Sequence, residues 1–189
     1  MRLHARLIPP QAMLDELNDV VHSVRGGASE LDYVPADLLQ IPMATFGNVS
    51  QVDAVKLADA FVKQAEDWAP MELCFAGGTA LEWPGDESVW AKLDGDLEQL
   101  ATLGRSIPQA VARLGYLVDR RKFRSWVSIG QITDSTTPVF LQALVDALEA
   151  YRGPVWTSRE LCLLNERYPT RDNEVMRLEV YRRIDLRRK

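Results

Sequence analysis

Histidine is the side chain best suited to acid–base chemistry near neutral pH, because its ordinary pKa of about 6.5 lets the imidazole accept or donate a proton. The chain of 189 residues contains two histidines, His4 and His22. We expect His22 to be a solvated residue on the surface of a helix. His4 and Arg6 alternate with apolar residues in a predicted strand and so lie on the side away from the core. The competing interpretation is a strand-surface histidine without a role, and a lone imidazole would supply half of an acid–base pair.

A second group of candidates lies around residue 124. Arg124 closes a basic run that can hold a phosphate or a nucleic-acid backbone. Runs of this kind are also typical of solvated loops. Trp126, two residues further on, can stack on a base, a contact worth about 1–3 kcal/mol in single-strand binders. It can equally fill a cleft with an apolar side chain, and both interpretations stay open.

Two strand–helix pairs are predicted in the first third of the chain. Residues 2–8 alternate apolar and polar side chains, which predicts a half-buried strand. Apolar residues then recur at steps of three and four over 13–24, which predicts a helix that ends at a glycine pair. After a polar loop, 38–46 is predicted to be a second strand. A Ser-x-x-Asp capping box opens a helix over 50–66.

The rest of the chain alternates between the same two kinds of element. Apolar runs bounded by glycine and proline predict short strands, and a Thr-Pro pair is typical of a helix start. Glycine and proline predict a break or bend near the centre of the first of these helices. The predicted elements are strands 71–75 and 88–93, helix 97–114, strand 123–132, helix 137–153, and strands 155–164 and 174–186.

Composition excludes several classes of protein. The net charge is −5 and the isoelectric point is about 5.1, so any binding of phosphate requires a local basic patch. The two cysteines, Cys74 and Cys162, lack metal-ligand spacing, and we expect two buried free thiols in a reducing cytoplasm. No segment has the roughly 20 apolar residues of a membrane span. We therefore expect a cytoplasmic protein with no membrane association, no metal and no cofactor.

Two segments of the chain have related patterns, Leu39-Gln40-Ile41-Pro42-Met43 and Phe123-Arg124-Ser125-Trp126-Val127-Ser128-Ile129. They resemble the paired active-site strands of the 2H phosphoesterase family, which includes bacterial 2′-5′ RNA ligases and RNA 2′,3′-cyclic phosphodiesterases. In that family each half of the molecule carries a strand of the form apolar-His-apolar-Thr/Ser-apolar. The resemblance extends over nearly the whole chain. It implies one α+β domain over 1–189, with two pseudo-symmetric lobes of mainly antiparallel sheet and outer helices around a central groove.

The resemblance implies four site positions, and three of them have lost the family's group. Gln40 and Trp126 stand where the family has its histidines, and neither side chain can act as an acid or a base. Pro42 removes the first hydroxyl, while Ser128 retains the second. Losing an acid–base partner typically costs about 10²–10⁴-fold in each step that the partner assists. We therefore expect the family reaction not to run.

Three hypotheses follow for the function. The leading one is a catalytically degenerate member of the family that binds a nucleotide, an RNA end or another small phosphate ligand in the groove, where His4, Arg6 and Arg124 are the ligand-binding candidates. The second is a diverged active phosphoesterase or cyclic phosphodiesterase that uses His4, Arg124 and Ser128. The third is a protein-interaction module whose groove is plugged by Trp126. The sequence does not identify the ligand, the pathway or the oligomeric state.

Overall fold

The first sheet joins strands from both ends of the chain. The computed structural model describes residues 1–24, 30–83, 86–116, 118, 124–167 and 177–187. The strands of this sheet run in the order β3-β1-β8-β9, and all neighbours are antiparallel. β1, close to the N-terminus, is therefore an interior strand. The bounds are β1 (Arg2–Leu7), β3 (Ile41–Asn48), β8 (Glu160–Arg167) and β9 (Arg177–Asp185).

The second sheet has the order β2-β6-β5-β4-β7 and is also antiparallel throughout. Its centre is the long β4–β5 pair, and β6 lies on the other side of β5. The bounds are β2 (Leu31–Tyr33), β4 (Met71–Trp83), β5 (Asp86–Gly95), β6 (Trp126–Ile132) and β7 (Trp156–Ser158).

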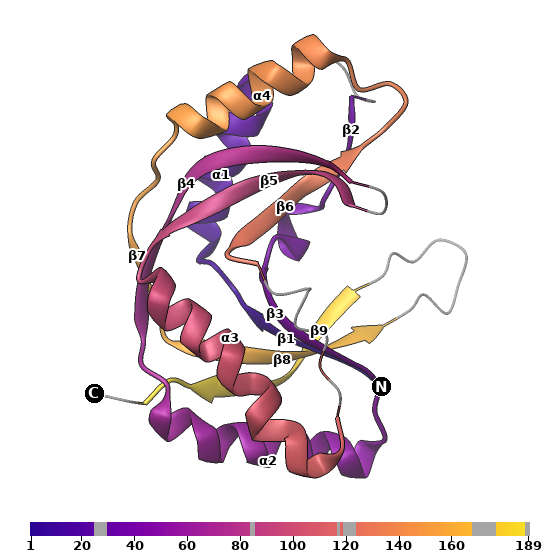
Figure 1. The fold of residues 1–189 in the computed structure, drawn as a ribbon, viewed down its shortest axis with the longest axis vertical. Helices are drawn as coiled ribbons and strands as arrows, with labels where there is room; N and C mark the ends of the chain where they lie inside the picture. Colours follow the sequence, from indigo (N-terminus) through magenta and orange to yellow (C-terminus); the bar gives the residue numbers. More distant parts are fainter. Residues whose placement is uncertain (25–29, 84–85, 117, 119–123, 168–176, 188–189) are drawn as a thin grey trace.

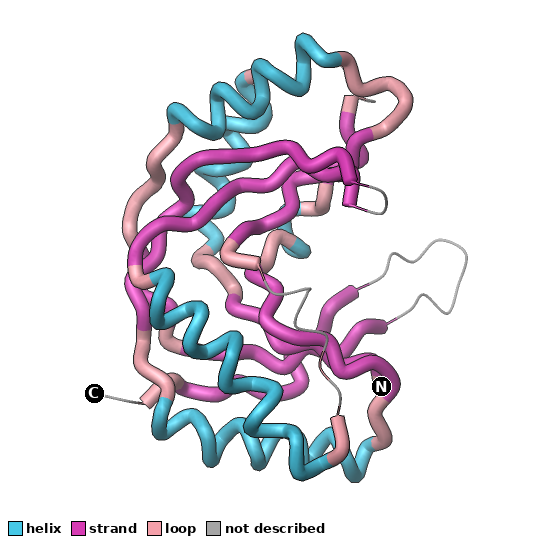
Figure 2. Tube along the Cα trace, in the orientation of Figure 1, coloured by secondary structure: helices cyan, strands magenta, loops and turns pink. Residues whose placement is uncertain are grey.

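The helices lie on the outside of the two sheets, as Figures 1 and 2 show. α1 (Gln11–Ser23) and α4 (Pro138–Ala150) contact each other at the end of the molecule formed by the second sheet, and α4 packs on β4. α2 (Gln51–Gln64) and α3 (Leu97–Val111) contact each other at the opposite end, against the first sheet. The expected α+β class, with antiparallel sheets and outer helices, is confirmed.

The predicted core face of β1 is buried, although His4 on the other face is buried as well. Leu3, Ala5 and Leu7 have no exposed surface, and they belong to a hydrophobic core cluster that includes residues from both sheets. At the start of α2, Ser50 Oγ accepts a hydrogen bond from the backbone N–H of Asp53, as the capping box predicts. The strand and the helix that frame the first half of the chain were thus predictable from pattern alone.

Two predictions for the middle of the chain were wrong in detail. β4 continues past residue 75 to Trp83, because the irregularity between Phe75 and Gly78 is absorbed by Gly77, which has φ of +88°. Of the predicted break or bend in α3, the break is not found, because the helix continues from Leu97 to Val111 with Pro108 inside it. Proline removes one helical hydrogen bond, and the buried face formed by Leu100, Leu103, Ile107 and Val111 holds the helix together across that point.

The predicted strand 155–164 is two strands. β7 pairs with β4 in the second sheet, and β8 pairs with β1 and β9 in the first, so the chain changes sheets at Arg159. The short strand β2 falls in a segment predicted to be a polar loop. Parts of two predictions, the start of strand 123–132 and most of the hairpin between the last two strands, lie outside the described residues. Among the described helices, none combines the length and the apolar character needed to cross a lipid bilayer.

Candidate functional site

A cavity of about 470 Å³ lies where the two sheets approach each other, and both contribute to its wall. β1, β3 and β9 supply residues from the first sheet, and β5 and β6 from the second. The described lining includes three arginines and a histidine but no Asp or Glu, so a protein of net charge −5 has a locally basic cavity. The lining residues are Arg2, His4, Arg6, Val34, Leu38, Gln40, Pro42, Ala44, Thr45, Trp90, Arg124, Ser128 and Leu178.

The structure brings most of the candidate residues together in this one cavity. The family-site positions of the two resembling segments meet there, although β3 and β6 belong to different sheets. Trp126 is the exception, because it is not among the lining residues. Those that line the cavity are His4, Arg6, Gln40, Pro42, Arg124 and Ser128.

Two irregularities in β3 determine which of its side chains face β1. The pairing of β1 with β3 shifts once between Ala5 and Arg6 and again between Leu3 and His4. Each shift adds one residue to β3. Pro42 pairs with Arg6, and the added residue that follows it places Thr45, instead of Ala44, opposite His4. Bulges of this kind re-aim side chains and are common beside active sites.

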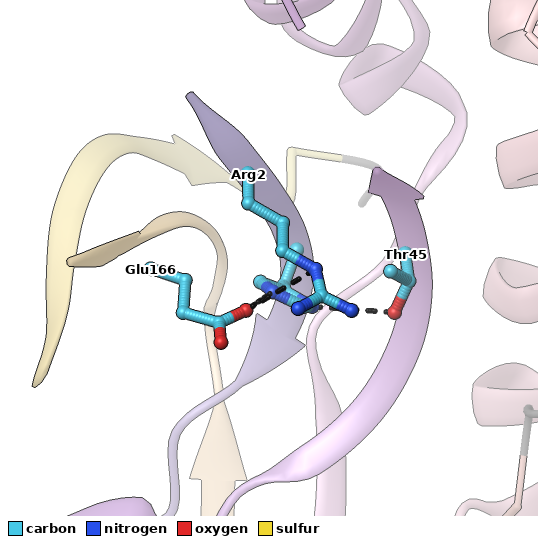
Figure 3. Close-up of polar contacts among 4 residues, drawn as sticks. Arg2, Thr45 and Glu166 are labelled. Atoms are coloured by element: carbon cyan, nitrogen blue, oxygen red, sulfur yellow. Dashed lines mark hydrogen bonds and ion pairs between the residues drawn. The ribbon is translucent and has the colours of Figure 1, made fainter. Parts of the chain in front are cut away.

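His4 is hydrogen-bonded through both of its ring nitrogens. Nε2 lies 2.9 Å from Glu166 Oε2 and Nδ1 lies 3.2 Å from Thr45 Oγ1, while Arg2 Nε lies 3.4 Å from the same Glu166 oxygen. Figure 3 shows Thr45 and Glu166 on opposite sides of this cluster, with Arg2 between them. An ionised carboxylate accepts hydrogen bonds only, so Nε2 carries the proton and Nδ1 is left to accept one from the Thr45 hydroxyl.

Burial lowers the pKa of His4 below its ordinary value, since only 7% of the residue is exposed. The hydrogen bond to Glu166 acts in the opposite direction and is the smaller effect, while the charge of Arg6 lowers the pKa further. The imidazole is therefore neutral near pH 7. Burial also lowers the pKa of the Arg6 guanidinium, and the Glu166 carboxylate partly offsets this change.

We predict a pH-dependent contribution of His4 to stability. Because the pKa of His4 is lower in the folded chain than its ordinary 6.5, the unfolded chain binds a proton at His4 at a higher pH than the folded chain does. The free energy of unfolding therefore falls as the pH drops through 6.5, and it becomes constant again below the folded-state pKa. Urea denaturation at about pH 7.5 and about pH 5.5 should show a smaller decrease for His4→Gln than for the unmodified protein. His22→Gln, which changes an exposed histidine, is the matched control. Equal pH dependence in all three proteins would contradict this assignment.

The Arg6 side chain carries a buried donor without an acceptor. Among the described residues, Nε of Arg6 has no hydrogen-bond partner, and neither has the indole Nε1 of Trp90. Both residues line the cavity. A buried N–H without a partner costs about 1–3 kcal/mol. Acceptor oxygens brought by a ligand would remove this cost.

Trp126 lies beside the cavity and contacts one of its cations. The Cζ atom of Arg124 is 5.7 Å from the centre of the Trp126 ring and 6.0 Å from that of Trp90, within the range of cation–π attraction. The two indole rings lie 6.4 Å apart. Trp126 therefore packs against Arg124 at the cavity wall.

Four important residues escaped the sequence argument. Arg2 could have been found, because it shares the alternation that points to His4 and Arg6. Nothing in the sequence marks Trp90, which lies in an apolar run typical of a buried strand. Thr45 lies opposite His4 because of the register shift between Ala5 and Arg6, and Glu166 is 162 residues away from its partner His4. The other basic residues of the run before Arg124 lie outside the described part of the chain.

A second cavity and the acidic residues offer no comparable site. The second cavity, of about 430 Å³, lies beside the N-terminal half of α4, and its described lining contains no charged side chain. Within the described ranges, no group of three or more His, Cys, Asp or Glu side chains is arranged to hold a metal ion. Of these two cavities, the first is therefore the one whose described lining combines charged side chains with buried N–H donors that have no hydrogen-bond partner.

Solved structures that share this fold over nearly their whole length include those of TT0787, of LigT and of a phosphoesterase. TT0787 of Thermus thermophilus superposes with a TM-score of 0.76 at 15% identity, over 100% of both chains. Escherichia coli LigT complexed with 3′-AMP gives a TM-score of 0.75 at 16% identity, over 98% of this chain and 97% of LigT. Another structure, of a phosphoesterase, gives 0.69 at 18% identity, over 98% of this chain and 97% of the other.

No protein-family model and no curated protein sequence matches the chain. LigT has also been crystallised with NADP⁺, with phosphate and with ATP. Similarity at 15–18% identity shows the fold. The two-sheet fold expected from the family resemblance is thereby confirmed, and the activity has to be argued from the residues of the cavity.

Proposed function

We propose that this chain is a 2H phosphoesterase-like protein whose cavity binds the phosphate of a nucleotide or RNA end without the two-histidine reaction of the family. The observation that carries the proposal is the basic lining, in which Arg2, Arg6 and Arg124 supply three positive charges, while the neighbouring carboxylate of Glu166 pairs with Arg2. Arginine suits this task because its planar N–H groups match phosphate oxygens. The unpartnered donors of Arg6 and Trp90 add two positions where such oxygens can bind.

The fold neighbours give independent support for the ligand class. Escherichia coli LigT has been crystallised with 3′-AMP and with phosphate. The absence of acid–base groups argues against turnover by the family route, because Gln40 and Trp126 occupy the two histidine positions of the resembling strands. Two free, buried cysteines accord with a reducing compartment, which we propose is the cytoplasm.

The geometry does not favour the alternative of a diverged enzyme in which His4 and Ser128 act directly on a phosphodiester. Both ring nitrogens of His4 are already bonded, one to Thr45 and the other to Glu166. A proton can therefore leave or reach a ligand only through one of these partners. The protein-interaction alternative requires Trp126 in the cavity, and the contact of its ring with Arg124 is an argument for the ligand-binding proposal instead.

Replacing Arg6 by alanine is expected to weaken the binding of 3′-AMP by about 10–100-fold, the effect of losing a charged hydrogen bond worth about 1.5–3 kcal/mol. Titration can be followed by tryptophan fluorescence, since Trp90 lines the cavity, and confirmed by calorimetry. Arg105→Ala removes the same charge from the exposed face of α3 and serves as the matched control. Equal affinities in the Arg6 and Arg105 variants, or no binding by the unmodified protein, would contradict the proposal.

A further inference from the structure

Thr45, His4 and Glu166 form a continuous hydrogen-bonded row across three adjacent strands. The strands are β3, β1 and β8, which are neighbours in the first sheet. Thr45 Oγ1 lies 3.2 Å from His4 Nδ1, and His4 Nε2 lies 2.9 Å from Glu166 Oε2. A hydroxyl next to an imidazole that is oriented by a carboxylate is the arrangement that activates a nucleophile.

The direction of the hydrogen bonds makes the Thr45 hydroxyl the group from which His4 can accept a proton. Nε2–H donates to Glu166, so the free lone pair of the neutral ring is on Nδ1 and faces Thr45. Thr45 also lines the cavity. The hydroxyl is thus within reach of both a base and a ligand.

The charges around this row agree with that assignment. The charged groups that face His4 are Arg2 and Arg6 on its own strand and Glu166 on β8, while β3 contributes the neutral Thr45. The two arginines and burial keep the ring neutral, and the carboxylate keeps it oriented. Arg6 and Arg124 belong to the same cavity and can neutralise the charge of a phosphoryl group.

We propose that Thr45 is a nucleophile, with His4 as its general base and Glu166 as the positioning residue, and that it accepts the phosphoryl group of a phosphate monoester held by Arg6 and Arg124. This inference rests on the proposed phosphate binding. Thr45 Oγ1 forms a bond to phosphorus as the bond from phosphorus to the leaving oxygen breaks. The hydroxyl proton passes to His4 Nδ1, the leaving oxygen departs as an anion that takes a proton from solvent, and His4 later releases its proton to solvent. A water molecule then cleaves the Oγ1–P bond, which releases inorganic phosphate and returns a proton to Thr45.

The test uses p-nitrophenyl phosphate, a monoester with a good leaving group. The unmodified protein should release p-nitrophenolate, and mass spectrometry should find one phosphoryl group on the peptide that contains Thr45. Thr45→Val, which keeps the shape and removes the hydroxyl, should lose both signals. Thr45→Ser should keep the label. Thr157→Val, an exposed threonine on β7, is the matched control.

The two partners of Thr45 are tested separately. His4→Gln should slow labelling by about 10²–10⁴-fold. Glu166→Gln removes the charged hydrogen-bond partner that raises the pKa of His4, so the acidic limb of the pH profile for labelling should move to lower pH. If Glu166 mattered for folding alone, the Glu166→Gln variant would give less active protein, and the acidic limb of its pH profile would stay at the same pH.

Several outcomes would overturn the inference. A label on another residue, p-nitrophenolate release that survives in Thr45→Val, or no label in a protein that binds 3′-AMP would each do so, and the last of these leaves the proposed binding function intact. A protein that neither binds 3′-AMP nor becomes labelled would contradict both proposals.

Discussion

Replacing Phe61 by alanine is expected to lower the free energy of unfolding by about 3–5 kcal/mol, the usual cost of deleting a buried aromatic ring. Phe61 has no exposed surface, and its ring packs edge-on against Phe46 of β3 at 5.8 Å and against Trp68 at 5.7 Å. Trp68 is in turn hydrogen-bonded to Ser106 of α3 through its indole nitrogen, at 2.6 Å. The ring thus joins α2, α3 and the strand that carries Thr45.

Urea denaturation measures this loss, and Val55→Ala gives the matched control. Val55 is on the same helix with 49% of its surface exposed, so its truncation should change the stability by no more than about 0.5 kcal/mol. A loss below about 1 kcal/mol for Phe61→Ala would contradict the central position of the ring. Because Phe46 belongs to β3, we also expect the Phe61 variant to bind 3′-AMP less tightly under conditions in which it is still folded.

Gly95→Ala is expected to destabilise the protein by about 2–6 kcal/mol, through backbone strain and a collision together. Gly95 has φ of +113°, and a Cβ atom built there would lie 2.2 Å from the carbonyl oxygen of Glu72. That oxygen accepts a hydrogen bond from the backbone N–H of Asp96, and the N–H of Glu72 donates to the Asp96 side chain. The backbone cannot move away without breaking this reciprocal pair.

Gly47→Ala separates strain from collision. Gly47 also has a positive φ, of +67°, but a Cβ there would meet nothing within 4 Å. Its replacement should therefore cost about 1–2 kcal/mol, the penalty of the left-handed conformation alone. Thermal or urea denaturation of the two variants measures the difference, and equal losses would show that the contact with Glu72 is relieved at no cost.

Strand periodicity predicted which side chains of β1 face the core and which face the cavity. Alternation in β1 correctly assigned Leu3 to the core and His4 and Arg6 to the other side. It could not predict Thr45, because a bulge changes which residue of β3 faces β1 and leaves no mark in the pattern. Nor could it pair His4 with Glu166, since strand order is not encoded in periodicity.

Similar limits explain the errors in the fold. The segment 155–164 was predicted to be one strand although the residues at its centre, 157–160, are polar, and the structure divides it at Arg159 between the two sheets. Glycine and proline signals were given too much weight at Gly77 and Pro108, where tertiary packing prevails over local preference. The family resemblance pointed to positions that line the cavity, whereas the chemistry that those positions can perform depends on contacts across the sheet.

The place of β1 between β3 and β8 has a consequence for how the protein is made. During synthesis β4, β5 and β6 leave the ribosome in succession and can pair at once, and β1 can pair with β3, whereas the other edge of β1 must wait for β8, which starts at Glu160. Contacts between segments so far apart in sequence form slowly, because a long loop must close first. The row that links Thr45 to Glu166 crosses this late junction. The cavity therefore acquires its complete wall at the end of folding, and a nascent chain cannot hold a ligand there before its last strands have docked.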